Sequence, residues 1–147
     1  MKIIAIASIG GHWTELLRLK PAFENNDLIF VSTNASYAQT VNGHTFYSVP
    51  DANRWNKMQV LKMAVAVYKI IRKEKPDVVI STGAAPGLLG IIAAKSMGAK
   101  TIWVDSIANA EKLSLSGRLA SHIASRTYTQ WPHLATASIL YNGNVLA

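Results

Sequence analysis

Short apolar runs alternate with longer stretches of helical periodicity along this 147-residue chain, and no other feature constrains the fold as strongly. Several runs are apolar on successive residues, which is typical of strands covered on both faces of a parallel sheet. The helical stretches between them are then crossover connections. We therefore predict strands at residues 2–7, 28–32, 45–49, 78–82, 101–105 and 126–129.

Residues that favour the start or the end of a helix lie in the stretches between these strands. Pro21 limits a first helix, and the Pro of the sequence KEKPD ends a long one that spans about 57–75. A third helix is predicted at 87–97 with Gly98 as its stop, and a fourth begins near Ser114. No repeat or linker interrupts the pattern. The sequence thus predicts one α/β domain over residues 1–147, a Rossmann-like parallel sheet with crossover helices.

The composition limits the classes of binding partner but does not select one of them. Lys and Arg outnumber Asp and Glu by 15 to 8, so the surface is expected to favour phosphates, acidic sugars, nucleic acid or an anionic bilayer. The absence of cysteine excludes disulfides and thiolate metal sites and suits the cytoplasm. The apolar N-terminal run is about half the length of a membrane span, and we interpret it as the first buried strand. Membrane contact is therefore expected to be peripheral or through a partner.

Small residues gather where two predicted strands lead into helices. Glycines let the backbone approach a ligand, and a following helix N-terminus favours negative charge, so both loops suit a phosphate or pyrophosphate. The alternative is that small residues only permit tight turns, but two such loops at corresponding strand ends favour a ligand site. The predicted contacts are Ser8, Gly10 and Gly11 in the first loop and Thr82, Gly83, Ala84 and Gly87 in the second.

Polar side chains in and beside these loops are the candidate catalytic and ligand-binding residues. His12 follows the first glycine pair and is a candidate general base or phosphate contact, although a loop histidine can also be an ordinary polar residue. Asp105 and Ser106 follow the fifth strand and either contact the ligand or cap the next helix. The other histidines show no metal-ligand spacing, so no metal is expected. The glycines do not form G-x-G-x-x-G and the second strand ends without an acidic residue, which argues against a nucleotide-dependent oxidoreductase.

The long helix combines an apolar surface with a narrow cationic stripe. Lys62, Lys69 and Lys73 fall on that stripe. Such a helix usually packs in the core and exposes one side to solvent. The more specific alternative is that the helix binds a membrane surface. The apolar surface is formed by Met58, Leu61, Val65, Tyr68 and Ile71.

Four segments together resemble a known family in order and over nearly the whole chain. They are SIGGHWTELLRL at 8–19, KPDVVISTGAAPG at 75–87, DSIANAEKLSLSGRLA at 105–120 and TQWPHL at 129–134. The chain resembles PssD-type and CpsF-type polysaccharide biosynthesis glycosyltransferase subunits, a family that includes the eukaryotic membrane-anchoring subunit of the dolichol-pathway UDP-N-acetylglucosamine transferase.

The resemblance implies the N-terminal, acceptor-side half of a GT-B glycosyltransferase in exopolysaccharide or capsule synthesis. A separately encoded catalytic subunit would carry the UDP-sugar site, and this chain would be inactive alone. The acceptor would be a lipid-diphosphate-linked saccharide on the inner face of the cytoplasmic membrane, to which the chain attaches peripherally. His12 would be the base of an inverting transfer without metal or other cofactor, and no nucleic acid is implied. A non-catalytic scaffold that recruits the catalytic subunit remains an alternative.

Overall fold

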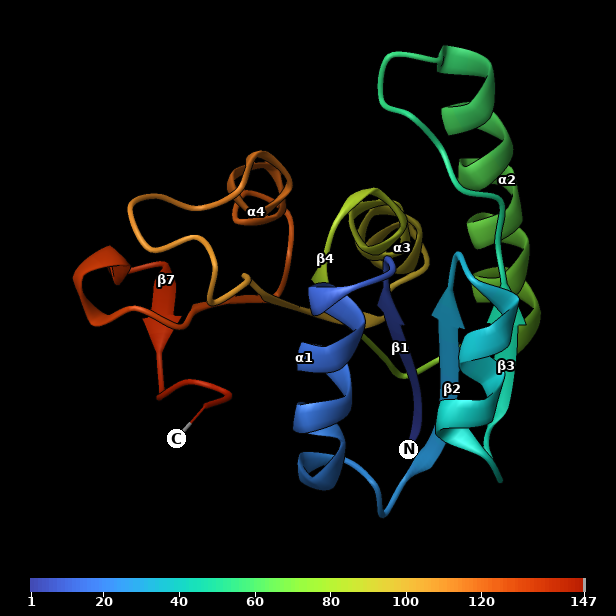
Figure 1. Cartoon of the computed structure of the whole chain (residues 1–147), viewed down its shortest axis with the longest axis horizontal. Helices are drawn as coiled ribbons and strands as arrows, with labels where there is room; N and C mark the ends of the chain where they lie inside the picture. Colours follow the sequence, from blue (N-terminus) through green and yellow to red (C-terminus); the bar gives the residue numbers. More distant parts are fainter. Residues whose placement is uncertain (147) are drawn as a thin grey trace.

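The computed structural model describes residues 1–146 and contains a seven-stranded parallel sheet in the order β3-β2-β1-β4-β5-β6-β7 (Figure 1). The chain runs outward from β1 to β3, returns to β4 beside β1, and then runs outward to β7. This doubly wound order confirms the predicted α/β Rossmann-like fold. The strands are β1 Lys2–Ala7, β2 Asp27–Ser32, β3 Thr45–Ser48, β4 Val78–Gly83, β5 Lys100–Val104, β6 Arg126–Thr129 and β7 Ile139–Tyr141.

Helices cover both faces of the sheet, as parallel strands require. In Figure 1, α1 lies in front of the sheet beside a 3₁₀ segment, while α3 lies behind it and α2 lies at the β3 side. The α-helices are α1 Gly11–Leu19, α2 Lys57–Glu74, α3 Ala85–Ser96 and α4 Leu115–Ala120. The 3₁₀ segments are η1 Lys20–Ala22, η2 Ala35–Val41 and η3 Pro132–Leu134.

Alternate side chains of β1 pack into two separate apolar cores, one on each face of the sheet. Ile4 and Ile6 pack with residues of α2 and α3, whereas Ile3 and Ala5 pack with Trp13 and other residues of the α1 side. A strand buried on both faces must be apolar at successive positions, which is the pattern seen in the sequence. This packing fixes the carboxyl ends of β1 and β4 side by side at the point where strand order reverses. Ligands bind at this position in open α/β sheets.

Several element boundaries differ from the sequence predictions by one or two residues, and one strand was not predicted. Helix α3 begins at Ala85, two residues before the predicted start, because Pro86 is tolerated in a first helical turn. Strand β5 ends at Val104, so Asp105 lies just beyond it. Strand β7 was not predicted, since it has three partly exposed residues and no periodic signal.

Candidate functional site

The two glycine-containing loops predicted from the sequence meet at the carboxyl ends of β1 and β4. Ser8 N donates a hydrogen bond to Gly83 O over 3.3 Å. Thr82 Oγ1 donates to His12 O at 2.6 Å, and His12 Nδ1 lies 3.1 Å from Thr82 O. His12 and Thr82 therefore hold each other through a reciprocal pair of hydrogen bonds, although they are 70 residues apart in the chain.

The contact with Thr82 defines which nitrogen of His12 carries the proton. A carbonyl oxygen only accepts, so the Nδ1 that lies against Thr82 O must be the donor. In the neutral ring, Nε2 then holds the free lone pair. A hydrogen-bond partner of one ring nitrogen fixes the tautomer of a histidine in this way. The other ring nitrogen is then free to accept a proton or bind a ligand. The geometry thus presents Nε2 as a basic atom on a ring whose orientation is fixed.

Gly83 allows the His12 ring to lie directly against the backbone of the second loop. Its φ of 141° lies in the region that favours glycine, and a Cβ placed on it would overlap the imidazole ring. Gly87 serves a different contact, because a Cβ there would overlap Ser81 Oγ and lie close to the Trp103 ring. Gly87 therefore permits α3 to approach the sheet, and as a ligand contact it remains a prediction.

Both helices that leave these loops begin without a side-chain cap. The residue before α1, Gly10, has φ 81° and ψ −137°, and the residue before α3, Ala84, has φ 42° and ψ −147°. The two turns thus have similar conformations, and at Ala84 a non-glycine residue adopts a positive φ. No side-chain cap bonds the first amides of α1 or α3 within residues 1–146. Two helix N-termini with positive partial charge flank the His12 ring.

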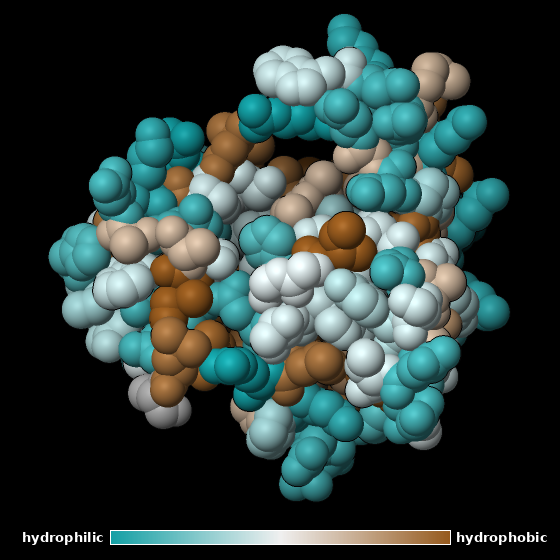
Figure 2. Space-filling model, in the orientation of Figure 1, coloured by the Kyte–Doolittle hydropathy of each residue, from teal (hydrophilic) through white to brown (hydrophobic). Residues whose placement is uncertain are grey.

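The first loop is open on its outer side. A Cβ on Gly10 or Gly11 would meet no atom within 4 Å. The space-filling view shows a hollow at this end of the molecule, beneath the loop that leads into α2 (Figure 2). Tyr37, which sequence reasoning missed, supports the loop: its hydroxyl accepts from Gly10 N at 3.0 Å, and its ring stacks on Trp13 with centroids 5.1 Å apart.

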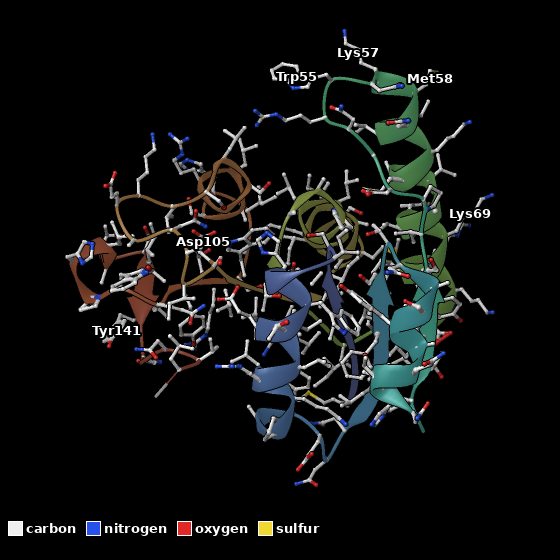
Figure 3. The ribbon with its side chains drawn as sticks, viewed as in Figure 1. Trp55, Lys57, Met58, Lys69, Asp105 and Tyr141 are labelled. Atoms are coloured by element: carbon white, nitrogen blue, oxygen red, sulfur yellow. The ribbon has the colours of Figure 1, made fainter. Side chains whose placement is uncertain are left out.

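Three polar residues predicted as ligand contacts use their side chains inside the protein. Thr82 is buried and donates to His12 O, and Ser106 Oγ accepts from Ala108 N at 3.1 Å. Asp105 is 2% exposed, and Oδ1 accepts from Trp103 Nε1 at 3.0 Å and from Ser114 Oγ at 2.7 Å. Its Oδ2 accepts from Ser114 N at 3.0 Å. Asp105 therefore fixes the loop before α4, which is the capping alternative, and its ligand role remains a prediction (Figure 3).

The TQWPHL segment, residues 129–134, holds the loop that follows β5 in place through hydrogen bonds. Trp131 Nε1 donates to Ile107 O at 2.7 Å, and His133 Nε2 donates to Ala110 O. Gln130 is buried and bonds Asp105 O at 2.9 Å. In the sequence analysis these residues entered only through the family resemblance, whereas in the structure they support the loop beside the site.

Helix α2 exposes most of its predicted apolar surface. Ile71 is buried, but four apolar side chains at spacings of three and four residues face outward, and we call them the α2 apolar stripe. Part of the stripe forms a groove of about 460 Å³ with Leu89 and Ile92 of α3. Lys69 and Arg72 border this groove. The α2 apolar stripe consists of Met58, Leu61, Val65 and Tyr68.

A second cavity, of about 390 Å³, lies on the α1 face of the sheet. Leu19, Phe23, Ile102 and Val104 line it together with residues 142–145, and none of these belongs to the glycine loops. Within residues 1–146, no group of three His, Cys, Asp or Glu side chains is arranged to hold a metal ion. In that same part of the chain, every helix is too short or too polar to cross a bilayer.

Solved structures of other proteins share this fold. MurG of Acinetobacter baumannii superposes with a TM-score of 0.81 and 16% identity, over 97% of this chain and 45% of MurG. UDP-GlcNAc 2-epimerase of Methanocaldococcus jannaschii, solved with UDP-GlcNAc and UDP, gives a TM-score of 0.72 and 21% identity over 98% of this chain and 47% of the epimerase. The chain thus spans less than half of these proteins. Its fold is that of the N-terminal half of a GT-B glycosyltransferase such as MurG.

Sequence comparison places the chain within a family. The model for oligosaccharide biosynthesis proteins that are Alg14 like matches residues 51–144, which is more than half of the chain. The chain belongs to this Alg14-like family. The human UDP-N-acetylglucosamine transferase subunit ALG14 is 26% identical over 91% of this chain and 77% of the human protein. The Yarrowia lipolytica protein of the same name is 35% identical over 51% of this chain and 37% of its own length.

Proposed function

We propose that this chain is the acceptor-binding, membrane-associated subunit of a two-chain inverting glycosyltransferase. The complex transfers a sugar from a UDP-sugar to a lipid-diphosphate-linked saccharide in exopolysaccharide or capsule synthesis. Residues 1–147 act as one acceptor-side domain, and a separately encoded catalytic subunit supplies the UDP-sugar site. Membership of the Alg14-like family and the fold of a GT-B N-terminal half support this assignment.

One observation carries the proposal: His12 is oriented by Thr82 O at the junction of two uncapped helix N-termini. A base and an anion site are the two components that transfer to a diphosphate-linked acceptor requires. Nε2 is the base, and the amides of the first turns of α1 and α3 bind the diphosphate. The open side of Gly10 and Gly11 leaves room for the acceptor.

The reaction follows from these positions. His12 Nε2 takes the proton of the acceptor hydroxyl as that oxygen forms a bond to the anomeric carbon of the donor sugar. The bond from that carbon to the UDP oxygen breaks, and UDP leaves with the electron pair. Attack opposite the leaving group inverts the configuration. Helix dipoles and backbone N–H groups carry the negative charge of the acceptor diphosphate without a metal.

Attachment to the inner face of the cytoplasmic membrane occurs through α2. Lys57, Lys62 and Lys69 accompany the α2 apolar stripe, and Trp55 at the start of the helix is 79% exposed. Figure 3 shows Trp55 on the loop that leads into α2, close to Lys57 and Met58 at the end of α2 that extends beyond the sheet. Cations attract anionic headgroups, and Trp favours the interface between headgroup and acyl chain. The bilayer that holds the acceptor lipid would then adjoin the edge of the sheet that carries His12.

Replacement of His12 by Ala tests the proposed reaction. In the complex with the catalytic subunit, the variant should lower turnover by about a hundredfold or more, the usual scale for loss of a general base. If His12 only bonds the phosphate, the Michaelis constant for the acceptor rises while turnover is kept. His122→Ala is the matched control, because His122 is exposed on the surface after α4. Wild-type turnover with unchanged acceptor dependence for His12→Ala would favour the scaffold alternative.

A further inference from the structure

A buried carboxylate on α1 lies one helical turn beyond His12 and takes no part in the proposed reaction. Glu15 is 6% exposed. Its Oε1 accepts from Ile107 N at 2.8 Å and from Gln130 Nε2 at 2.8 Å. Through these bonds α1 is tied to the loop after β5 and to the end of β6.

Gln130 uses its whole side chain in this link. Its Nε2 also donates to Asp105 O at 2.9 Å, and its Oε1 accepts from Val145 N at 2.9 Å. The residue is 3% exposed. Gln130 therefore joins α1, the loop after β5 and the C-terminal segment in one buried hydrogen-bonded network, and we call Glu15 and Gln130 the α1 clasp.

The energetics argue for a geometric role. Within residues 1–146 no cation pairs with Glu15, and Oε2 has no hydrogen-bond partner. A buried carboxylate without a cation is costly, and an acceptor of the same shape without charge would form the same two bonds. The network therefore adds little net stability through its charge, and its distinctive property is that it fixes the distance and rotation of α1.

Two attachments one turn apart determine how α1 sits on the sheet. The His12–Thr82 bonds tie its first turn to β4, and Glu15 ties its second turn toward β5 and β6. Buried Trp13 and Leu16 already hold α1 against the sheet, and the two attachments add directional bonds that set the fine rotation of its first two turns. We infer that the α1 clasp positions His12, so that Glu15 and Gln130 are positioning residues for the base. This inference rests on the proposed function, in which His12 acts on the acceptor.

The His12 ring itself reports on the clasp in the isolated chain. In ¹⁵N-labelled protein, the ring nitrogens of His12 should show the Nδ1–H tautomer that the Thr82 contact requires. Glu15→Ala and Gln130→Met remove the clasp from either side, and the second change keeps side-chain length. Both should shift the tautomer ratio by about threefold to tenfold toward Nε2–H, the scale of one weakened hydrogen bond. Glu15→Gln keeps an oxygen for both donors and should retain the wild-type ratio.

Glu74→Gln is the control for removing a negative charge. Glu74 accepts from Tyr47 Oη at 2.9 Å and pairs with Lys2, far from the glycine loops in the sheet. This variant should leave the His12 signals unchanged. The inference is overturned if Glu15→Ala or Gln130→Met gives a folded amide spectrum with the wild-type tautomer ratio. A folded Glu15→Gln variant that loses the Nδ1–H tautomer would also contradict it.

Kinetics of the complex separate this inference from the proposed function. Glu15→Ala should lower turnover by about tenfold or more while Glu15→Gln restores it, since a small misplacement of a catalytic group has effects of this size or larger. If His12→Ala is impaired and Glu15→Ala is not, the clasp inference fails alone. If His12→Ala has wild-type kinetics, the proposed function fails, whatever the tautomer measurements give.

Discussion

At the scale of single residues, the His12 ring lies so close to Gly83 that no side chain fits between them. A side chain on Gly83 would overlap the ring and would also sit at a φ of 141°. Gly83→Ala should therefore displace His12 and lower turnover of the complex by about tenfold or more. The strain should lower the free energy of unfolding by about 1–3 kcal/mol, measured by urea denaturation.

Gly43→Ala separates strain from overlap. Gly43 also has a positive φ, 87°, but a Cβ there would meet no atom within 4 Å. This variant should lose comparable stability and keep wild-type turnover. Equal turnover in the two variants would show that His12 does not depend on its contact with Gly83.

Asp105 provides a second test at this scale, because three hydrogen bonds converge on its buried carboxylate. Asp105→Ala leaves the Trp103 indole and the Ser114 amide without their acceptor. Each unpaired buried donor costs about 1–3 kcal/mol. The free energy of unfolding, measured by urea denaturation, should therefore fall by about 3 kcal/mol. Asp51→Ala, which removes an exposed carboxylate in the loop between β3 and α2, is the control and should change stability little. A stable Asp105→Ala protein with weakened acceptor binding would instead support the ligand role.

The sequence predicted part of the site for a clear reason. Glycines and a histidine at strand ends are local signals, so the two loops and His12 could be identified from the chain alone. The bonds between His12 and Thr82 could not, because they depend on how α1 and β4 pack. Glu15 left one usable signal: it lies between Trp13 and Leu16, two buried residues of the same helix. A charged residue among core positions indicates burial with a specific partner.

At the scale of elements, α2 is the helix whose apolar residues the fold leaves partly uncovered. The α2 apolar stripe lies on the outside of the molecule, next to exposed lysines and Trp55. The chain should therefore float with vesicles that contain anionic phospholipid at low salt and bind less at high salt, because salt screens the headgroup attraction. Binding to neutral vesicles should be weaker.

Paired substitutions locate this contact. Met58→Ser with Leu61→Ser should lower the bound fraction severalfold, since each removes apolar area that would enter the interface. Tyr141→Ser is the control, because Tyr141 is exposed on β7, on the opposite side of the molecule from α2 (Figure 3). Flotation of the double variant at the wild-type level would exclude α2 as the attachment surface.

The strands were predicted more accurately than the segments between them. A parallel strand buried on both faces is apolar at successive residues, so six of the seven strands were visible in the sequence. Segment η2, Ala35–Val41, was not predicted, because its 3₁₀ turns are held by Asn34 and by packing on Trp13 rather than by a periodic pattern. Ser114 was a reliable signal: its hydroxyl accepts from Gly117 N and starts α4 as expected.

At the scale of the whole molecule, the chain corresponds to less than half of the solved proteins that share its fold. Under the proposed function, the active site lies in the cleft between two Rossmann-like halves, so we predict that this chain binds the acceptor and that the second chain supplies the donor site. The isolated chain should also bind NAD negligibly in a fluorescence titration, because β2 ends in Ser32 without an acidic residue for the ribose. Tight NAD binding would revive the oxidoreductase alternative.

The two-chain assignment is tested by measuring sugar transfer with and without the catalytic subunit. The assay follows radiolabelled sugar from UDP-N-acetylglucosamine, and from other UDP-sugars in parallel, into a lipid-diphosphate-linked saccharide. As the second protein, the assay uses any short α/β protein that is found to be encoded in the neighbouring reading frame. We predict no transfer by this chain alone, transfer when both proteins are present, and loss of that transfer with His12→Ala. Transfer by the purified chain without any added protein would contradict the account.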